Sequence, residues 1–327
     1  MKPKIFVTHT IPDKGIIMLK EKFDIELNDS DGILEKKKLI DRSKNKDVIL
    51  SLLSDSIDSE VINSCNNLKI ISNYAVGFNN VDLKTATERG IFVTNTPRTL
   101  DETTADFVFA LILSISRRVV ESDKFMRNGA YKGWGAMDFL GFDVYNSTLG
   151  VIGMGNIGKA VGRIAYYGFL MKVLYSDKFI DAKQLKFVAE NVDMNTLLSE
   201  SDFVTMNVPL KEDTYHLIGE RELNLMKKTA YLINTSRGPV VDEKALYNAL
   251  NEKRITGAAI DVYENEPKFV TGLEKLDNII MTPHIASATI QTRQLMSFKA
   301  AQNIIDFFNG KIPEGLVNKD VLKTHHF

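Results

Sequence analysis

Three residues able to bind a small carboxylic acid and move a proton on it each follow a short β-rich run in the second half of the chain: Arg237, Glu266 and His284. A guanidinium grips a carboxylate through two parallel hydrogen bonds and polarises a neighbouring carbonyl. A histidine titrates near neutral pH, and a carboxylate on its second ring nitrogen fixes its tautomer. Because ligands bind beyond the carboxyl ends of parallel strands, we expect these side chains to converge.

Two other residues compete for these roles. Glu264 lies two residues before Glu266 and is the alternative carboxylate. His9 follows the first apolar run of the chain and is a rival to His284. The remaining histidines are weaker candidates, in a predicted loop or in the C-terminal tail, where disorder is common: His216, His325 and His326.

A glycine-rich turn, Gly153-Met154-Gly155-Asn156-Ile157-Gly158, joins a predicted strand to a predicted helix. In that context the spacing is the dinucleotide-binding fingerprint. Gly153 allows the tight turn, Gly155 lets a pyrophosphate approach the backbone, and Gly158 lets the helix pack on the strand. The free N–H groups and positive dipole end of the helix favour the phosphates.

Asp177 ends the next predicted strand, nineteen residues after Gly158. An acid at this place accepts hydrogen bonds from both ribose hydroxyls and repels a 2′-phosphate, so NAD(H) is favoured. The adjacent Lys178 leaves use of NADP(H) open. Hydride transfer to a carbonyl carbon needs a proton on its oxygen, so this turn and the Arg–Glu–His set together predict reduction of a 2-keto acid.

Alternating strand and helix patterns must position these residues. The first hundred residues predict strands at 5–7, 23–27, 48–53, 68–72 and 91–94, in a flavodoxin-like sheet. One long helix is predicted from Glu102 to Asn128, with an all-round apolar first half that indicates burial between domains or subunits. A second series predicts strands at 148–153, 172–176, 203–208, 231–235, 257–262 and 278–281, with a weak seventh candidate at 187–189. The last predicted helix spans 289–308.

The length of 327 residues suggests two domains. We expect an α/β protein with two doubly wound parallel sheets: a flavodoxin-like substrate-binding domain of residues 1–98 plus 288–327, and a Rossmann NAD-binding domain of residues 99–287. In this arrangement the substrate would bind in the cleft between the two.

Composition excludes several classes. A net charge of −1 offers no basic surface for nucleic acid or an anionic membrane. The single Cys65 excludes a disulfide framework and a four-cysteine metal site, fits a reducing compartment and has no required chemical role. The N-terminus has no signal-peptide pattern, which predicts a cytoplasmic protein. We expect no metal centre.

Several segments in matching order resemble the D-isomer-specific 2-hydroxyacid dehydrogenase family, in particular its glyoxylate/hydroxypyruvate reductases. They are the glycine turn, residues 201–214, the run Leu232-Ile233-Asn234-Thr235-Ser236-Arg237-Gly238, Asp261 through Glu266-Pro267, Thr282-Pro283-His284-Ile285, and the loop Asn73-Tyr74-Ala75-Val76-Gly77-Phe78-Asn79-Asn80-Val81-Asp82. The resemblance covers essentially the whole chain.

The resemblance implies roles for further residues. Arg237 and the backbone amides of Val76 and Gly77 would bind the substrate carboxylate, and His284 paired with Glu266 would be the general acid. The remaining residues assigned to the substrate are Ser287 and Trp134, where Trp134 would reach a neighbouring subunit's site or be a core aromatic. Those assigned to the cofactor are Asn156, Ile157, Val208, Pro209, Thr214, Thr235, Ser236 and Asp261.

The resulting prediction is a homodimeric reductase that converts glyoxylate or hydroxypyruvate to the D-2-hydroxy acid with NADH. The alternatives are a dehydrogenase for another D-2-hydroxy acid, such as D-lactate or D-glycerate, and an NAD-sensing protein like the corepressors that share this fold.

Overall fold

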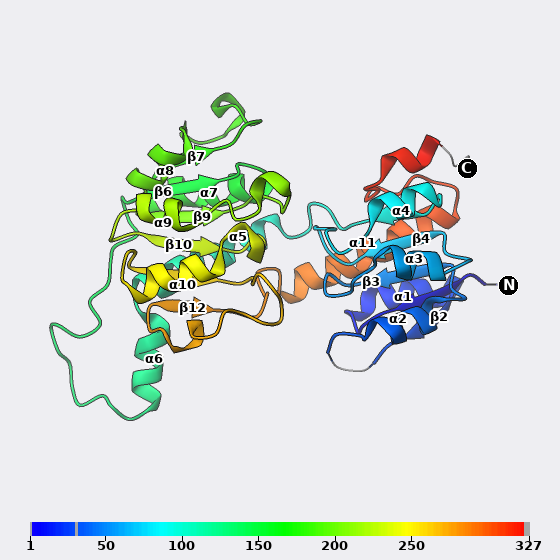
Figure 1. Ribbon diagram of the computed structural model, residues 1–327, viewed down its shortest axis with the longest axis horizontal. Coiled ribbons are helices and arrows are strands. Elements are labelled where there is room, and N and C mark those ends of the chain that lie inside the picture. Colours follow the sequence, from blue (N-terminus) through cyan, green and yellow to red (C-terminus); the bar gives the residue numbers. More distant parts are fainter. Residues whose placement is uncertain (1, 30–31, 324–327) are drawn as a thin grey trace. The chain divides into compact units, whose positions relative to one another are not determined.

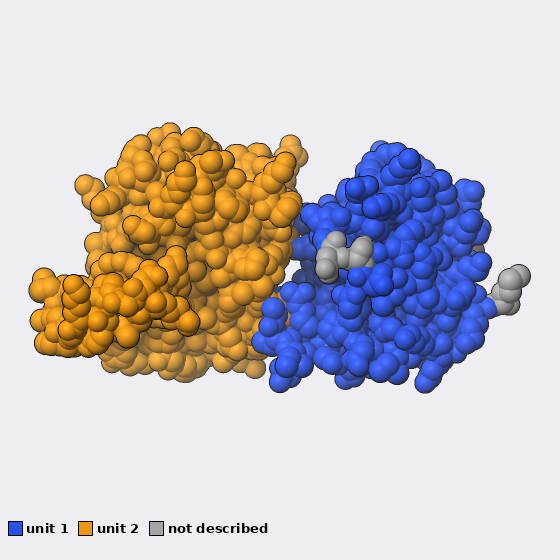
Figure 2. Space-filling view, turned by 90° about the horizontal axis from the view of Figure 1, so that it is seen from below, with its two compact units in different colours: residues 1–100, 288–327 blue, residues 101–287 orange. Residues whose placement is uncertain are grey.

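The computed structural model describes residues 2–29 and 32–323, so His325 and His326 lie outside the described residues. The chain forms two compact units (Figures 1 and 2). Unit 1 contains residues 1–100 and 288–327, and unit 2 contains residues 101–287.

Unit 1 is built on a parallel sheet of the order β2-β1-β3-β4-β5, which confirms the predicted flavodoxin-like topology. Its inner strands are apolar runs that are buried throughout, as expected where helices cover both faces. Its strands are β1 (Lys4–Val7), β2 (Asp24–Leu27), β3 (Val48–Ser51), β4 (Ile70–Asn73) and β5 (Phe92–Thr94). Its helices are α1 (Asp13–Lys22), α2 (Lys36–Ser43), α3 (Ser59–Ser64), α4 (Leu83–Glu88), α11 (Ile290–Phe308) and the short 3₁₀ helix η5 (Lys319–Lys323).

Helix α11, from the far end of the sequence, packs directly against α1. The Ser297 hydroxyl donates to the Pro12 carbonyl at 2.6 Å and accepts from the Gly15 amide at 3.0 Å. A Cβ at Gly15 would lie 2.2 Å from the Ser297 carbonyl oxygen, so glycine is needed for this close approach. Thr289 caps α11 by accepting from the Thr292 amide.

Unit 2 is built on a seven-stranded parallel sheet of the order β12-β11-β10-β9-β6-β7-β8, a doubly wound Rossmann topology. Its strands are β6 (Thr148–Ile152), β7 (Lys172–Ser176), β8 (Glu190–Asn191), β9 (Phe203–Met206), β10 (Tyr231–Asn234), β11 (Gly257–Ile260) and β12 (Ile279–Met281). The seventh strand is therefore present, but the expectation at 187–189 is wrong. Phe187 instead packs its ring against Gly162, where a Cβ would lie 2.7 Å away.

Helices cover the two faces of this sheet and enclose two apolar clusters. Figure 1 shows the arrangement of these helices around the strands. Its helices are α5 (Asp101–Ser116), α6 (Val119–Arg127), α7 (Asn156–Phe169), α8 (Met194–Glu200), α9 (Glu220–Leu225) and α10 (Glu243–Asn251), with 3₁₀ helices η1 (Ala182–Gln184), η2 (Glu212–Thr214), η3 (Gly238–Val240) and η4 (Leu273–Lys275). No helix in the described ranges is long and apolar enough to cross a membrane.

The prediction of one helix from Glu102 to Asn128 is wrong. The structure has two helices, α5 and α6, separated at Arg118, which adopts φ +55°. The Ser116 carbonyl at the end of α5 accepts a hydrogen bond from the Phe142 amide, so a distant segment takes the place of the next helical turn. Helix α5 buries one side in unit 2 and leaves Leu113 37% exposed in the single chain.

Candidate active site

Strand register brings the predicted site residues to one edge of the unit 2 sheet. Ile152 of β6 and Asn234 of β10 are both in register with Met206 of β9, and Ile260 of β11 is in register with Asn234 and with Met281 of β12. Five strands therefore end at one level, and the loops that follow them carry the glycine turn, Arg237, Glu266 and His284.

Glu266 and His284 form a direct pair in unit 2. His284 Nδ1 lies 3.0 Å from Glu266 Oε2, and the Tyr263 amide donates to Glu266 Oε1 at 3.1 Å. Burial alone would raise the pKa of Glu266, but the hydrogen bond and charge of His284, the Tyr263 amide and the charge of Arg237 together lower it below its usual value. Glu266 is therefore an ionised acceptor for the ring, and His284 Nε2 is the atom left to exchange a proton.

The alternative carboxylate, Glu264, has a different partner. Its Oε1 lies 2.9 Å from His216 Nε2, and the His216 ring stacks on Tyr215. The backbone amides of Glu264 and Val270 both donate to the carboxylate of Glu243, which is 4% exposed. Burial raises the pKa of Glu243, although these two amides oppose the shift. Two glutamates two residues apart thus belong to two separate networks.

Arg237 is placed by a close approach of two loops. A Cβ on Gly238 would lie 1.9 Å from the carbonyl carbon of Tyr263, so only glycine allows the turn to lie against the segment that leads to Glu266. Arg237 Nη1 donates to the Ser236 carbonyl at 2.6 Å, while its buried Nε has no hydrogen-bond partner within the described chain. Burial lowers the pKa of this guanidinium and the charge of Glu266 opposes the shift. An unpartnered buried donor on a cation fits an anionic ligand.

Asp261, assigned above to the cofactor, makes a set of contacts that the spacing did not indicate. This fully buried carboxylate accepts from the Thr282 hydroxyl at 2.6 Å and from the amides of Ile285 and Ala286 at 2.8 Å each. Its carbonyl accepts the His284 amide at 3.0 Å. Asp261 therefore holds the backbone on both sides of His284, which adopts φ +54°.

Two further side chains brace these loops and were not singled out from the sequence. Burial, together with neighbouring carboxylates, raises the pKa of Tyr263 to about 12, so its hydroxyl stays protonated and donates to the Thr282 carbonyl at 2.9 Å. The buried Asn234 accepts from the Ser236 amide and donates to the Arg237 carbonyl. The only available signal was that polar residues end apolar strands, and that signal does not say which loop each side chain contacts.

The glycine turn has the geometry that a dinucleotide needs. Gly153 has φ +89°, and a Cβ on Gly158 would lie 2.1 Å from the Gly153 carbonyl oxygen. A Cβ on Gly155 would meet nothing within 4 Å, so open space adjoins the first turn of α7, which includes the assigned Asn156 and Ile157. The Asp177 carboxylate accepts from the Met154 amide at 2.8 Å and the Phe179 amide at 2.7 Å, which ties the end of β7 to this turn.

The other residues assigned to the cofactor line the same sheet edge. The Val208 side chain lies beside Gly153, and Thr214 donates to the Pro209 carbonyl at 2.6 Å. Ser236 donates to Asn234. Thr235 Oγ1 and Asn207 Oδ1 are buried without a hydrogen-bond partner among the described residues. These unpaired polar atoms, together with the space at Gly155, fit a bound dinucleotide.

Unit 1 contains the other predicted substrate residues, Val76 and Gly77, in the loop after β4. It also contains the rival histidine. His9 Nε2 lies 2.9 Å from the Asp55 carboxylate, which is buried and accepts from Thr8 and the Leu52 amide. His9 therefore also pairs with an acid, Asp55. The donors that hold this acid, Thr8 and Leu52, follow strands β1 and β3 of unit 1.

Trp134 is 85% exposed in this chain, so its interpretation as a core aromatic is wrong. Ser287 is half-buried, three residues after His284.

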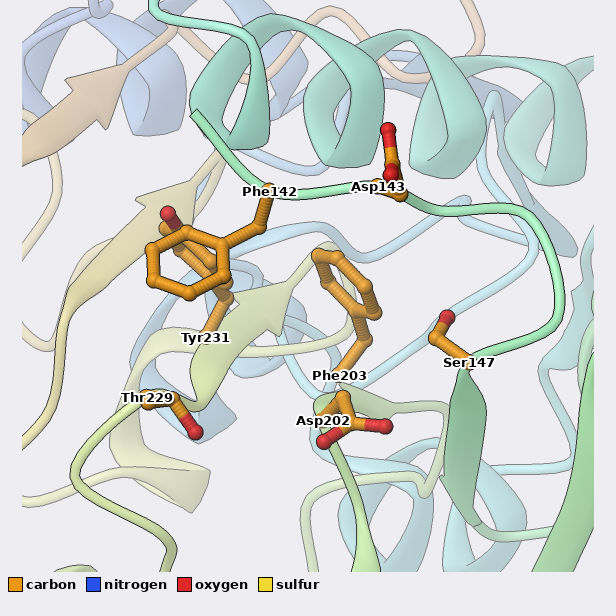
Figure 3. Close-up of a pocket in the computed structure, with 7 residues that line it drawn as sticks. All are labelled: Phe142, Asp143, Ser147, Asp202, Phe203, Thr229 and Tyr231. Atoms are coloured by element: carbon orange, nitrogen blue, oxygen red, sulfur yellow. The ribbon is translucent and has the colours of Figure 1, made fainter. Parts of the chain in front are cut away.

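A small pocket of about 190 Å³ lies at the opposite, amino ends of the unit 2 strands, where the rings of Phe203 and Tyr231 stack with centroids 5.4 Å apart (Figure 3). The Asp202 carboxylate lines this pocket and already accepts hydrogen bonds from the Thr148 amide and from Lys227 Nζ.

Comparisons with known proteins match the chain to one family. Residues 109–286 match the family model of the D-isomer specific 2-hydroxyacid dehydrogenase, NAD binding domain. The chain is 49% identical over 327 residues to a glyoxylate reductase of Korarchaeum cryptofilum, covering 99% of this chain and 98% of that protein.

Two solved structures show the same fold. A protein from Thermus thermophilus superposes with a TM-score of 0.91 at 37% identity, covering 96% of this chain and 99% of that one. An NADPH-dependent glyoxylate/hydroxypyruvate reductase from Sinorhizobium meliloti, in complex with NADP and malonate, gives a TM-score of 0.85 at 27% identity, covering 97% of both chains.

The doubly wound sheet of unit 2, together with the match to an NAD-binding domain, defines a nicotinamide-dependent dehydrogenase. The chain belongs to the D-isomer-specific 2-hydroxyacid dehydrogenase family. It is an NAD(P)-dependent oxidoreductase that acts on small 2-keto and 2-hydroxy acids.

Proposed function

We propose that this enzyme reduces glyoxylate or hydroxypyruvate to the D-2-hydroxy acid, with NADH as the preferred reductant. The observation that carries the proposal is the Glu266–His284 hydrogen bond at 3.0 Å in the same unit as an arginine with an unpartnered buried Nε. Relatives named glyoxylate reductase support the substrate, since they are similar over almost the full length of this chain. Residues 1–98 with 288–327 serve as the substrate-binding domain, and residues 99–287 as the cofactor domain.

The Arg237 guanidinium of unit 2 binds the carboxylate and carbonyl of the substrate. In unit 1, the amides of Val76 and Gly77 are donors suited to a carboxylate. A guanidinium can take a carboxylate oxygen and the neighbouring carbonyl oxygen together, which withdraws electrons from C2. Arg237 Nε has no hydrogen-bond partner in the described structure, and it would donate to the substrate in this complex.

His284 then protonates the carbonyl oxygen from Nε2. Glu266 accepts from Nδ1, so the ring keeps one orientation and one tautomer, and the carboxylate offsets the positive charge of the protonated ring. Bound reduced nicotinamide supplies the hydride to C2. In the direction of oxidation His284 accepts the proton.

The preference for NADH rests on Asp177, whose carboxylate lies at the end of β7 beside the glycine turn. A 2′-phosphate would be repelled there. The adjacent Lys178 is exposed, and its Nζ lies 3.6 Å from Asp213 Oδ2. To contact a 2′-phosphate, the Lys178 side chain would have to break this ion pair. Because a relative in the family is NADPH-dependent, use of both cofactors is the second outcome.

The homodimer is part of the proposal. Helix α6 and the segment that leads to β6 extend from unit 2 (Figure 1) and expose large apolar side chains. These are Val119, Met126, Tyr131, Trp134, Met137 and Leu140. A second copy would cover them, and Trp134 would then reach the neighbouring site. Light scattering of the purified protein tests this, since a monomer would contradict it.

The buried free thiol of Cys65 supports a reducing compartment, for which we propose the cytoplasm.

The decisive experiment is a panel of 2-keto acids (glyoxylate, hydroxypyruvate, pyruvate and branched-chain analogues) with NADH and NADPH, reported as kcat/KM. We expect glyoxylate or hydroxypyruvate with NADH to give the highest value, and hydroxypyruvate to yield D-glycerate. A higher value for pyruvate would reassign the substrate. Tight NADH binding without turnover of any acid would contradict the enzymatic function.

A further inference from the structure

The loop between β4 and α4 is held by three asparagine side chains, Asn73, Asn80 and Asn95, here called the asparagine clasp. The amides of Asn73 and Asn80 lie against each other: Asn73 Nδ2 donates to Asn80 Oδ1 at 3.0 Å, and Asn80 Nδ2 lies 3.2 Å from Asn73 Oδ1. Asn73 is fully buried. The pair closes the base of the loop of residues 74–79.

The base of the loop is also fixed to the neighbouring strand end. Asn80 Nδ2 donates to the carbonyls of Leu52 and Asp55 at 3.0 Å each, and Asn73 Oδ1 accepts from the Ser51 hydroxyl at 3.0 Å. These bonds tie Asn80, at the end of the loop, to the ends of β3 and β4.

Three consecutive carbonyls of the loop are anchored to unit 1. The Thr96 amide donates to the Ala75 carbonyl at 2.8 Å, and Asn95 Nδ2 donates to the Val76 carbonyl at 2.7 Å. Asn73 Nδ2 donates to the Gly77 carbonyl at 2.9 Å. Each of these oxygens accepts a bond from the body of the unit.

In a trans peptide the carbonyl of one residue and the N–H of the next lie in one plane and point in opposite directions. Anchoring the Ala75, Val76 and Gly77 carbonyls therefore directs the N–H groups of Val76, Gly77 and Phe78 away from the anchors. Within residues 2–29 and 32–323 none of these three amides donates a hydrogen bond to protein. Val76 and Gly77 are only half-buried and Phe78 is 37% exposed, so a ligand can reach them.

We propose that the asparagine clasp orients three N–H groups, those of Val76, Gly77 and Phe78, to bind the carboxylate of the substrate. Asn73, Asn80 and Asn95 are then positioning residues, and the Phe78 amide is a third donor beside the two that the proposed function already uses. The inference rests on that function for the identity of the ligand. Successive free amides form an anion-binding concavity, and an oriented set loses less entropy on binding.

The test uses Asn73→Ala, Asn80→Ala and Asn95→Ala in the full-length protein. Asn318→Ala is the matched control, because this buried asparagine of unit 1 makes three hydrogen bonds around β5, to Val93, Ile91 and Thr87. The measurements are KM and kcat for the best 2-keto acid, the Kd of oxalate as a small dicarboxylate probe by calorimetry, the Kd of NADH, and Tm.

We expect KM and the oxalate Kd to rise about tenfold in the clasp variants, the lower end of the range for losing one hydrogen bond to a charged group, because the N–H groups are misoriented and not removed. The kcat and the NADH Kd should stay near wild-type values. Asn318→Ala should lower Tm without moving KM. Asn95 is only half-buried, so its variant tests the proposal even if the two variants at the loop base fail to fold.

Unchanged KM and oxalate Kd in folded clasp variants would overturn the inference, as would an equal rise in Asn318→Ala. A wild-type protein that turns over no 2-keto acid would overturn the proposed function instead. The oxalate titration needs no turnover, so it still decides the role of the loop in that case.

Discussion

Glu266 Oε2 and His284 Nδ1 lie 3.0 Å apart although eighteen residues separate them in the chain. Two loops produce this contact. Asp261 ties the His284 loop to the end of β11, and the Tyr263 amide holds the other oxygen of Glu266. The pair is thus supported from both sides, and its ring is oriented before substrate arrives.

Replacing His284 should remove the proton donor. His284→Asn is expected to lower kcat by about 10²–10⁴-fold, the usual contribution of acid–base catalysis. His9→Asn is the matched control, because His9 is also paired with a carboxylate, Asp55. Steady-state kinetics of both variants decide between the two histidines, and a large loss in His9→Asn with little effect at His284 would reverse the assignment.

Replacing Arg237 with lysine keeps the charge but removes the planar fork. Loss of a hydrogen bond to a charged group corresponds to roughly a 10- to 150-fold decrease in kcat/KM for the 2-keto acid. Arg254→Lys is the control, since Arg254 is also partly buried in unit 2 but bonds to Glu220 and Asn224. Equal kcat/KM in Arg237→Lys and wild type would show that this guanidinium does not bind substrate.

Glu266→Gln should change the pH dependence of stability. Folding lowers the pKa of Glu266 below its usual value of 4.5, so the ionised carboxylate stabilises the fold. That stabilisation is complete above the unfolded pKa and is lost as pH falls through the folded pKa. The difference in unfolding free energy between wild type and Glu266→Gln should therefore shrink as pH falls from about pH 5 through the folded pKa of Glu266.

Denaturant titrations across a pH series measure this difference. Glu264→Gln serves as the control for activity, because Glu264 pairs with His216 rather than His284. We expect Glu266→Gln to lower kcat strongly and Glu264→Gln to retain it. The opposite ranking would make Glu264 the catalytic partner.

Two glycines of the turn should fail in different ways. A Cβ on Gly155 meets nothing within 4 Å, so Gly155→Ala should keep its Tm but bind NADH more weakly, since the methyl enters the space of the pyrophosphate. A Cβ on Gly158 would lie 2.1 Å from a carbonyl oxygen, so Gly158→Ala should lose about 1–3 kcal/mol of stability. Thermal unfolding and NADH titration of both variants check this, and unweakened NADH binding in Gly155→Ala would argue against a cofactor there.

Asp177→Ser should raise kcat/KM for NADPH relative to NADH, because it removes the charge that opposes a 2′-phosphate. It should also lower Tm, since Asp177 accepts from the Met154, Phe179 and Ile180 amides. Asp181→Ser, an acid in the same loop that caps η1, is the control for general effects of lost charge. An unchanged ratio would mean that Asp177 does not set cofactor preference.

Local patterns were enough to predict most strands and the glycine turn, because apolar periodicity and glycine placement are read within a few residues. They failed at Arg118, where a helix break has no glycine or proline and depends on the Phe142 amide bonding to Ser116. They failed again at the seventh strand, which is two residues long and exposed, so that it has no apolar run to detect.

The sequence by itself determined the residue types of the chemistry, the parallel α/β class and the acid at Asp177, since each depends on local spacing or on a family motif. Only the tertiary structure decided which carboxylate serves which histidine. It also showed that Asp261 holds the His284 loop and that the asparagine clasp anchors three consecutive carbonyls. These contacts join residues from different strand ends, so strand register and loop packing produce them, and spacing along the chain does not contain that information.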